Sequence, residues 1–183
     1  MSYPCEIKEQ PAQPTLSIRT RSAVQALPQL LGQSYGAIMQ YLGQLGEQPA
    51  GMPFAAYFNM DMQDLDVEIG FPVSKRLPDQ GNIKAGEIPG GHVATCLYIG
   101  PYEACGPAYE ALGQYAKEHY FTPTGVSYEF YLNDPNAEPK QEPQTLILLP
   151  LTAELQPALF LEALFEDSLI VPDPDRMGSG SLL

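Results

Sequence analysis

Basic residues are scarce in this chain of 183 residues. Lysine and arginine number 9 against 22 aspartate and glutamate residues, which gives a formal net charge of −13. DNA binding requires clustered basic side chains that neutralise phosphates, so this balance argues against direct binding of nucleic acid. The acidic surface favours the approach of cations, although a simple role in solubility explains most of the charge.

Cysteines and long apolar runs are also few. The three cysteines, Cys5, Cys96 and Cys105, are odd in number and lack paired spacings, which favours a reducing compartment. No apolar segment approaches the roughly twenty residues of a membrane span. The N-terminus lacks the basic stretch and apolar run of a leader peptide. We therefore expect a soluble, cytoplasmic protein that does not contact membranes.

Motifs for metals and common cofactors are missing as well. The two histidines, His92 and His119, do not lie at ligand spacing from carboxylates or cysteines. The acidic run from Asp61 to Glu68 lacks the calcium-loop pattern and is interpreted as a solvated hairpin. Phosphate-binding glycine patterns and nucleophile elbows are absent from the sequence. We expect neither a metal nor a cofactor.

The chain does contain an internal repeat. A shift of 74 positions pairs Tyr35 with Tyr109, Tyr41 with Tyr115, Phe54 with Tyr128, Tyr57 with Tyr131, and Asn59 with Asn133. Each half has the pattern of a strand, a helix and two further strands. Two copies are too few for a solenoid and instead predict a domain with pseudo-twofold symmetry.

The expected elements follow from apolar periodicity and from turn residues. In the first half they are a strand at 15–20, a helix at about 27–45, and strands at 54–59 and 65–73. In the second half they are a strand at 92–99, a helix that opens near Pro107, and strands at 126–132 and 145–149. We therefore expect an α+β domain over residues 1–151, with halves at about 1–75 and 88–151. Its tandem duplicated strand-helix-strand-strand modules would form antiparallel sheets with helices on one side and a central ligand cleft.

A lone carboxylate lies inside the most aromatic of these strands. A period of two places Tyr128, Phe130 and Leu132 on one face, and Glu129 and Tyr131 on the other. If the second face is sheltered from water, an unpaired carboxylate there is costly unless it binds a proton or a partner. A lipophilic cation is the natural partner. The alternative is that Glu129 simply lies on the solvated face of an antiparallel sheet.

The repeat predicts the surroundings of this glutamate. Each helix can cover only one face of its small sheet, so the open faces are expected to meet or to flank a cleft. Glu129 and Tyr131 would lie on that side, and their counterparts in the first half are Ala55 and Tyr57. A small residue opposite the glutamate would leave room for a pocket. Glu68 alternates with apolar neighbours and is a candidate for a second acidic group in the cleft.

Four runs of the second half are similar to a known family. They are IPGGHVA at 88–94, GPYE at 100–103, AYEAL at 108–112 and YEFYLNDP at 128–135. In this order they resemble the gyrase-inhibitor-like (GyrI-like) small-molecule-binding family, which also provides effector-binding domains of multidrug-responsive and AraC-type bacterial transcription activators. The likeness covers roughly residues 3–151. It implies a ligand cleft between the two modules, in which a buried glutamate, matched by Glu129, meets cationic lipophilic compounds among aromatic side chains.

Two functions from different classes remain open. In the first, the chain is a stand-alone binding protein that senses or sequesters small lipophilic, cationic or aromatic molecules. Its candidate ligand-binding residues are Glu129, Tyr131, Tyr57, Tyr109, Ala55 and Glu68. In the second, implied by the resemblance, it hydrolyses electrophilic small molecules with Glu129 as general base and Tyr109 or Tyr131 assisting. Binding is favoured because no second catalytic group is evident, and inhibition of a topoisomerase rests on the family name alone.

Both ends of the chain carry expectations. No helix-turn-helix precedes the first strand, so we do not expect the chain itself to be a transcription factor. Residues 152–183 form an extension that the resemblance does not cover, with a short apolar helix at about 157–170 and a flexible end. This helix is expected to pack on the domain or to pair with a second subunit in a homodimer. The alternatives are a lid over the cleft and a dock for a partner protein.

Overall fold

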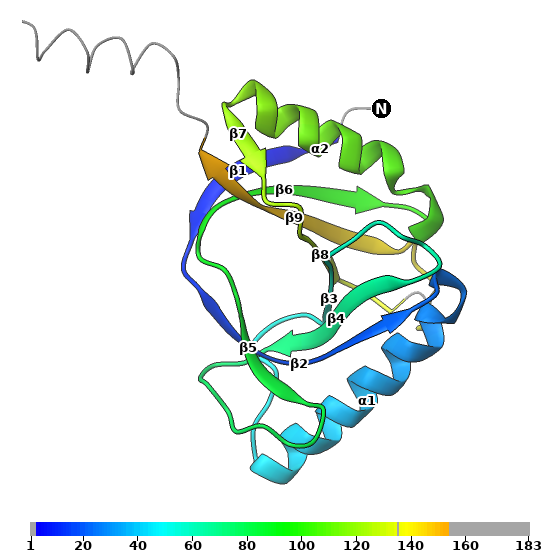
Figure 1. Ribbon diagram of the computed structural model, residues 1–183. Helices are drawn as coiled ribbons and strands as arrows, with labels where there is room; N and C mark the ends of the chain where they lie inside the picture. Colours follow the sequence, from blue (N-terminus) through cyan, green and yellow to red (C-terminus); the bar gives the residue numbers. More distant parts are fainter. Residues whose placement is uncertain (1–2, 135, 154–183) are drawn as a thin grey trace, which may run out of the picture. The chain divides into compact units, whose positions relative to one another are not determined.

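Two strand-helix-strand-strand units form an α+β fold in the part of the chain that the structure describes (Figure 1). The computed structural model describes residues 3–134 and 136–153. The first unit contains β2 (Gln13–Ser22), α1 (Leu27–Leu45), β3 (Phe54–Tyr57) and β4 (Leu65–Pro72). The second contains β6 (Gly91–Ile99), α2 (Gly106–Glu118), β8 (Ser127–Tyr131) and β9 (Gln144–Ala153). The predicted order of elements is confirmed.

Three strands were not predicted from the sequence. They are β1 (Cys5–Gln10), β5 (Lys84–Ile88) and the short β7 (Phe121–Pro123), which pairs with β9. The main sheet has the order β1-β6-β9-β8-β3-β4-β2-β5, so each edge strand joins the unit to which it does not belong in sequence. Cys5 lies opposite Cys96 and Gln13 lies opposite Ile88, so the two ladders keep one register. The chain from Cys5 to Ser17 therefore runs beside the chain from Lys84 to Cys96, paired in two ladders with a break at residues 11–12 and 89–90.

This pairing curls the sheet (Figure 1). One edge of the sheet is formed by β1 and β6 and the other by β2 and β5, and the same two segments, β1–β2 and β5–β6, bend from one edge to the other. The bend lies between β5 and β6 at Gly90. A Cβ atom at this position would lie 2.6 Å from the backbone nitrogen of Ala12. The two segments can approach this closely only because Gly90 has no side chain.

Both helices cover the outer face of the curled sheet (Figure 1). Helix α1 has a proline in its first turn and ends at Gly46, whose φ of 68° is the left-handed conformation that favours glycine. Its buried Ile38 and Leu42 pack with Leu16 and Phe71 of the first unit. The corresponding contacts of α2 are made by Ala108, Leu112 and Ala116, which pack with Ala94, Cys96, Ile147 and Leu149. The apolar face of each helix thus buries the alternate residues of its own unit.

The inner face of the sheet carries a smaller apolar cluster that joins the two units. Phe54 and Ala56 of β3 pack there with Tyr128 of β8 and Leu148 of β9. The ring of Phe54 lies 5.9 Å from the rings of both Tyr128 and Phe130. These distances are those of favourable aromatic pairs, so β3 and β8 are joined by packing as well as by backbone hydrogen bonds.

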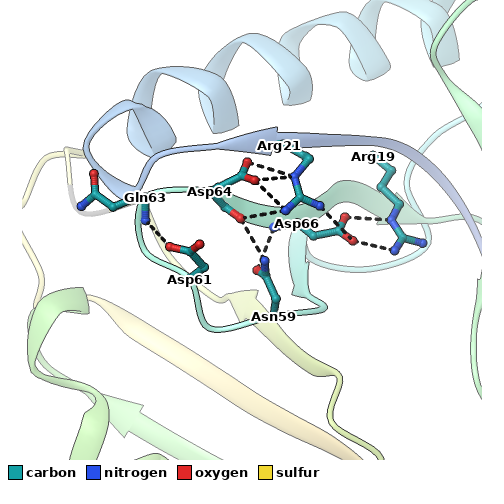
Figure 2. Close-up of polar contacts among 7 residues, drawn as sticks. All are labelled: Arg19, Arg21, Asn59, Asp61, Gln63, Asp64 and Asp66. Carbon is teal, nitrogen blue, oxygen red and sulfur yellow. Dashed lines mark hydrogen bonds and ion pairs between the residues drawn. The ribbon is translucent and has the colours of Figure 1, made fainter.

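The hairpin between β3 and β4 is acidic and is bound by two arginines of β2 (Figure 2). Arg19 donates hydrogen bonds of 3.0 and 2.9 Å to the two carboxylate oxygens of Asp66. Arg21 does the same for Asp64, with a shortest distance of 2.7 Å. These hydrogen bonds lower the pKa of both carboxyl groups, but exposed pairs of this kind add little stability. Within the described ranges, no group of three or more acidic, histidine or cysteine side chains could hold a metal ion.

The C-terminal extension lies almost entirely outside the described residues, which end at Ala153. The helix predicted at 157–170 is therefore still a prediction, as are its roles as lid, dimer contact or dock. None of the described helices is long and apolar enough to cross a membrane. Cys5, Cys96 and Cys105 are free thiols.

Candidate functional site

Glu129 lies where the two units meet. Strands β3 and β8 pair antiparallel at the centre of the sheet, with Ala55 directly opposite Glu129. These two residues are also matched by the sequence repeat, so the pseudo-twofold axis passes between them. A symmetric position is thus occupied by a carboxylate in one unit and by a methyl group in the other.

Two tyrosine hydroxyl groups bind the carboxylate of Glu129. Tyr109 of α2 donates a hydrogen bond of 2.6 Å to Oε1, and Tyr131 of β8 donates one of 2.9 Å to Oε2. The hydroxyl oxygens of Tyr57 and Tyr131 are 3.1 Å apart. Because the single proton of Tyr131 is directed to Glu129, Tyr57 is the donor in this contact. The structure therefore brings Glu129, Tyr131, Tyr57, Tyr109 and Ala55 together, and their role in ligand binding is still a prediction.

The face on which Glu129 lies was predicted wrongly. Its hydrogen bond to Tyr109 of α2 places it on the outer, helix-covered face of the sheet, and not on the face that the helices leave open. Ala55 is fully buried on the same face, beneath residues of α1. The strand periodicity was correct, but periodicity alone does not determine which side a helix covers.

Glu68 does not join this cluster. It lies on the inner face of β4, where its Oε1 accepts a hydrogen bond of 2.5 Å from the hydroxyl group of Ser17. It also lines a cavity that Glu129 does not reach. The alternation of Glu68 with Val67 and Ile69 was read correctly, but the sheet separates the two glutamates.

Three further residues belong to the surroundings of Glu129. Tyr35 of α1, the repeat partner of Tyr109, donates a hydrogen bond of 2.9 Å to the backbone oxygen of Phe54. Tyr109 binds the carboxylate of Glu129, but Tyr35 binds a backbone oxygen because Ala55, the counterpart of Glu129, has no carboxylate. Tyr102 stands edge-on to Tyr131, with ring centroids 5.5 Å apart, and Cys105 lies at the start of α2. The sequence repeat pairs Tyr35 with Tyr109 and could have identified Tyr35 as part of the site. Neither Tyr102 nor Cys105 is among the tyrosine and phenylalanine pairs of the repeat, so the repeat did not point to them.

Burial controls the protonation of this cluster. It raises the pKa of Glu129, an effect that the hydrogen bonds from Tyr109 and Tyr131 partly offset. Burial and the nearby negative charge of Glu129 together raise the pKa of Tyr109 and Tyr57, and that of Cys105 to about 11. The tyrosines are therefore neutral hydrogen-bond donors at neutral pH. A half-buried carboxylate surrounded by neutral donors and aromatic rings is suited to bind a cation.

This raised pKa has a testable effect on stability. Between its unfolded and folded pKa values, Glu129 binds more protons in the folded state, so its contribution to the free energy of unfolding falls as pH rises. We expect the free energy of unfolding of the wild type, minus that of Glu129→Gln, to decrease as pH rises from the ordinary pKa of glutamate, about 4.3, toward neutrality. Urea unfolding of both proteins across this range measures the difference. A difference that increases with pH would contradict the assignment.

Two cavities open on the inner face of the sheet, and neither is lined by Glu129. The larger, of about 530 Å³, is lined in part by Glu68, Phe58 and Tyr128. The smaller, of about 350 Å³, is lined in part by Phe130 and Leu146. Beside Glu129, the ring of Tyr102 packs against Tyr131 and is itself 40% exposed.

The profile of the GyrI-like small molecule binding domain matches residues 3–152. The chain belongs to this family. The matched segment contains both units and every residue described around Glu129. The resemblance seen in the sequence is thus confirmed, and the chain carries a small-molecule-binding domain.

Solved structures show the same GyrI-like fold. The crystal structure of the EcmrR C-terminal domain has a TM-score of 0.63 and 24% identity, and the match covers 84% of this chain and 99% of that one. EcmrR in a cryo-EM structure of an EcmrR–DNA complex has a TM-score of 0.70 and 23% identity. That match covers 84% of this chain and only 58% of the EcmrR chain.

A hydrolase from Listeria innocua also shares the GyrI-like fold, with a TM-score of 0.56 and 14% identity. The match covers 81% of this chain and 91% of the hydrolase. No curated protein matches the chain. At these identities the likeness concerns the fold, so the ligand has to be inferred from the residues of the site.

Proposed function

We propose that the chain binds small lipophilic cations, and that Glu129 is the countercharge. The observation that carries this proposal is a half-buried carboxylate whose hydrogen bonds come from neutral tyrosines. No ion pair within 3–134 or 136–153 involves Glu129. A carboxylate in this state retains an uncompensated desolvation cost, which a bound cation would offset.

Aromatic side chains supply the second part of the binding energy. Tyr57, Tyr109, Tyr131 and Tyr102 all lie close to the carboxylate or to each other. A cation over a well-placed ring gains about 0.5 to 2 kcal/mol, and the apolar part of the ligand gains from leaving water. A lipophilic cation gains both the attraction to the rings and the burial of its apolar part. A small hydrated cation has no apolar part to bury and keeps water between its charge and the rings.

The decisive experiment compares tetraphenylphosphonium binding to the wild type and to Glu129→Gln by calorimetry. We expect the variant to bind about 10- to 100-fold more weakly, because it keeps the shape of the site but loses the charge opposite the cation. Glu68→Gln is the matched control, since it removes the same charge from the other face of the same sheet and should leave the affinity unchanged.

A neutral ligand provides the second control. Triphenylphosphine oxide has a similar apolar bulk but no net charge, so we expect it to bind weakly and equally to the wild type and to Glu129→Gln. If tetraphenylphosphonium also binds both proteins equally, Glu129 is not the countercharge.

The second candidate function is hydrolysis of an electrophilic small molecule. It is favoured by the raised pKa of Glu129 and by the two tyrosine hydroxyls within hydrogen-bond distance, which would suit a general base and its assisting acid. However, each carboxylate oxygen already accepts a tyrosine hydrogen bond, so an attacking water would have to displace one of them. Turnover of an epoxide or a similar electrophile by the wild type, lost in Glu129→Gln, would favour this function.

The biological setting is part of the same proposal. The domain would sense its ligand for a partner or sequester it, in the cytoplasm and without contacting DNA itself. The cytoplasmic location agrees with the three free thiols. The matched C-terminal domain of EcmrR is part of a longer protein that has been seen in a complex with DNA. A binding domain joined to another functional part can report its ligand to that part, so this match supports a sensing role.

A further inference from the structure

The two inner-face cavities occupy equivalent positions in the two units, but their chemistry differs. Ala56 of β3 pairs with Glu68, while its repeat counterpart Phe130 pairs with Leu146. Glu68 lines the larger cavity and Leu146 lines the smaller one. Equivalent positions thus hold a carboxylate on one side and an isobutyl group on the other. The charge in the larger cavity is therefore not required by the fold.

The polar groups of the larger cavity include two carboxylates and two basic side chains. Glu68 and Glu87 line it together with Arg19 and His92. The guanidinium group of Arg19 is already bound by both carboxylate oxygens of Asp66 (Figure 2). Its Cζ atom lies 3.9 Å from the centroid of the Phe58 ring. Its charge is thus largely neutralised, although it also attracts Glu68. Of the two basic side chains, Arg19 is thus already partnered, and within the described residues neither Arg19 nor His92 forms an ion pair with Glu68 or Glu87.

Glu68 also has spare capacity to accept hydrogen bonds. Its Oε1 accepts the hydrogen bond of Ser17, and within the described ranges its Oε2 takes part in no hydrogen bond or ion pair. Close by, the hydroxyl oxygen of Thr15 is buried and has no hydrogen-bond partner in that part of the chain. A Cβ atom at Gly86 would lie 3.1 Å from this oxygen and 3.5 Å from Oε1 of Glu68. Glu68 therefore offers free lone pairs to the cavity, while the unpartnered Thr15 hydroxyl, which can donate as well as accept, lies outside the lining.

The rest of the lining is apolar and aromatic. Tyr128 contributes from β8, Val126 directly precedes that strand and Phe58 directly follows β3. Pro89 and Pro150 also line the cavity. Burial and the charge of Glu68 raise the pKa of Tyr128 to about 12, so its ring is neutral at neutral pH. The volume of about 530 Å³ lies within the range of sites that hold small organic molecules.

We propose that this inner-face cavity is a second binding site, which takes a protonated primary amine attached to a flat apolar group. The ammonium group donates hydrogen bonds to Glu68 and, at the rim, to Glu87. The flat group lies against Phe58, Val126 and Tyr128. The site is separate from Glu129, which lies on the other face of the sheet, and it does not depend on the proposed function of that residue.

The chemistry of the acceptors selects a primary amine. A carboxylate with free lone pairs favours a ligand that brings several N–H donors, which a quaternary cation lacks. A carboxylic acid ligand would face two like charges, because Arg19 is already held by Asp66. The apolar second cavity offers none of these acceptors and should not bind the amine.

Tryptamine is a suitable probe, and backbone amide shifts in a titration of the ¹⁵N-labelled protein report where it binds. We expect saturable shifts at Gly86, Gly90 and Val126 around the cavity. In Glu68→Gln the dissociation constant should rise about tenfold or more. In Glu129→Gln the shifts at these cavity residues, and the dissociation constant that they report, should remain as in the wild type.

Two further measurements keep the test decisive. Glu87→Gln, at an exposed edge position, should weaken binding less than Glu68→Gln, and it replaces that variant if Glu68→Gln does not fold. N-acetyltryptamine, which is neutral, should bind only weakly. Three results would each overturn the proposal. Tryptamine could bind the wild type and the cavity variants with equal affinity, or indole-3-propionate could bind more tightly than tryptamine. The third result is that the shifts are confined to residues around Glu129.

Discussion

Gly70→Ala is expected to destabilise the protein by about 3 kcal/mol or more. Gly70 lies on β4 between Phe54 of β3 and Ser17 of β2. A Cβ atom at this position would collide with the backbone oxygen of Leu16 and lie 2.8 Å from the Cβ of Ser17. The obstacle is mainly backbone, which cannot rotate away, so the ladder between β2 and β4 must separate.

The matched control is Gly32→Ala in α1. A Cβ atom at Gly32 meets nothing within 4 Å, and alanine has the higher helix propensity. This substitution should leave stability unchanged or raise it by up to about 1 kcal/mol. Urea unfolding followed by circular dichroism measures both variants. If Gly70→Ala is as stable as Gly32→Ala, β2 and β4 do not approach as closely as described.

Phe54→Ala is expected to lower the free energy of unfolding by about 3 to 5 kcal/mol. The side chain of Phe54 is 1% exposed and packs against Tyr128 and Phe130 across the junction of the two units. Its removal loses apolar burial and leaves a cavity that the paired strands cannot close. Because β3 and β8 also position Ala55 and Glu129, the variant should bind tetraphenylphosphonium more weakly even where it is folded.

Met60→Ala is the control for this prediction, because Met60 is 78% exposed and follows the same strand. Its effect should lie within about 0.5 kcal/mol of zero. Thermal and urea unfolding of both variants give the comparison. A loss of less than about 1 kcal/mol for Phe54→Ala would show that the junction does not depend on this ring.

The two faces of the central strands carry different chemistry. On the outer face, Glu129 is bound by neutral tyrosines beneath the helices. On the inner face, Glu68 is bound by a serine and borders a cavity. Because a strand alternates its side chains, one sheet can hold two acidic groups that do not interact directly. Glu129→Gln and Glu68→Gln therefore serve as controls for each other.

Much of the fold was predictable because the local signals were strong. The apolar spacing from Leu27 to Leu45 and the alternation in β4 gave the helix and strand where the structure has them. The edge strands β1 and β5 were missed because charged residues and a glycine interrupt their apolar pattern. Their exchange between the two units depends on contacts about 80 residues apart, which leave no local pattern.

The sequence by itself determined the two-unit α+β plan and the family, because apolar periodicity, the 74-residue repeat and the motifs can all be read along the chain. The same periodicity and repeat placed Glu129, Tyr131 and Tyr57 on one face. Only the tertiary structure decided that helices cover Glu129 and that Glu68 borders a separate cavity. The physical reason is that alternation assigns residues to two faces without saying what packs on each. That choice is made by long-range strand pairing and by the burial of helix faces.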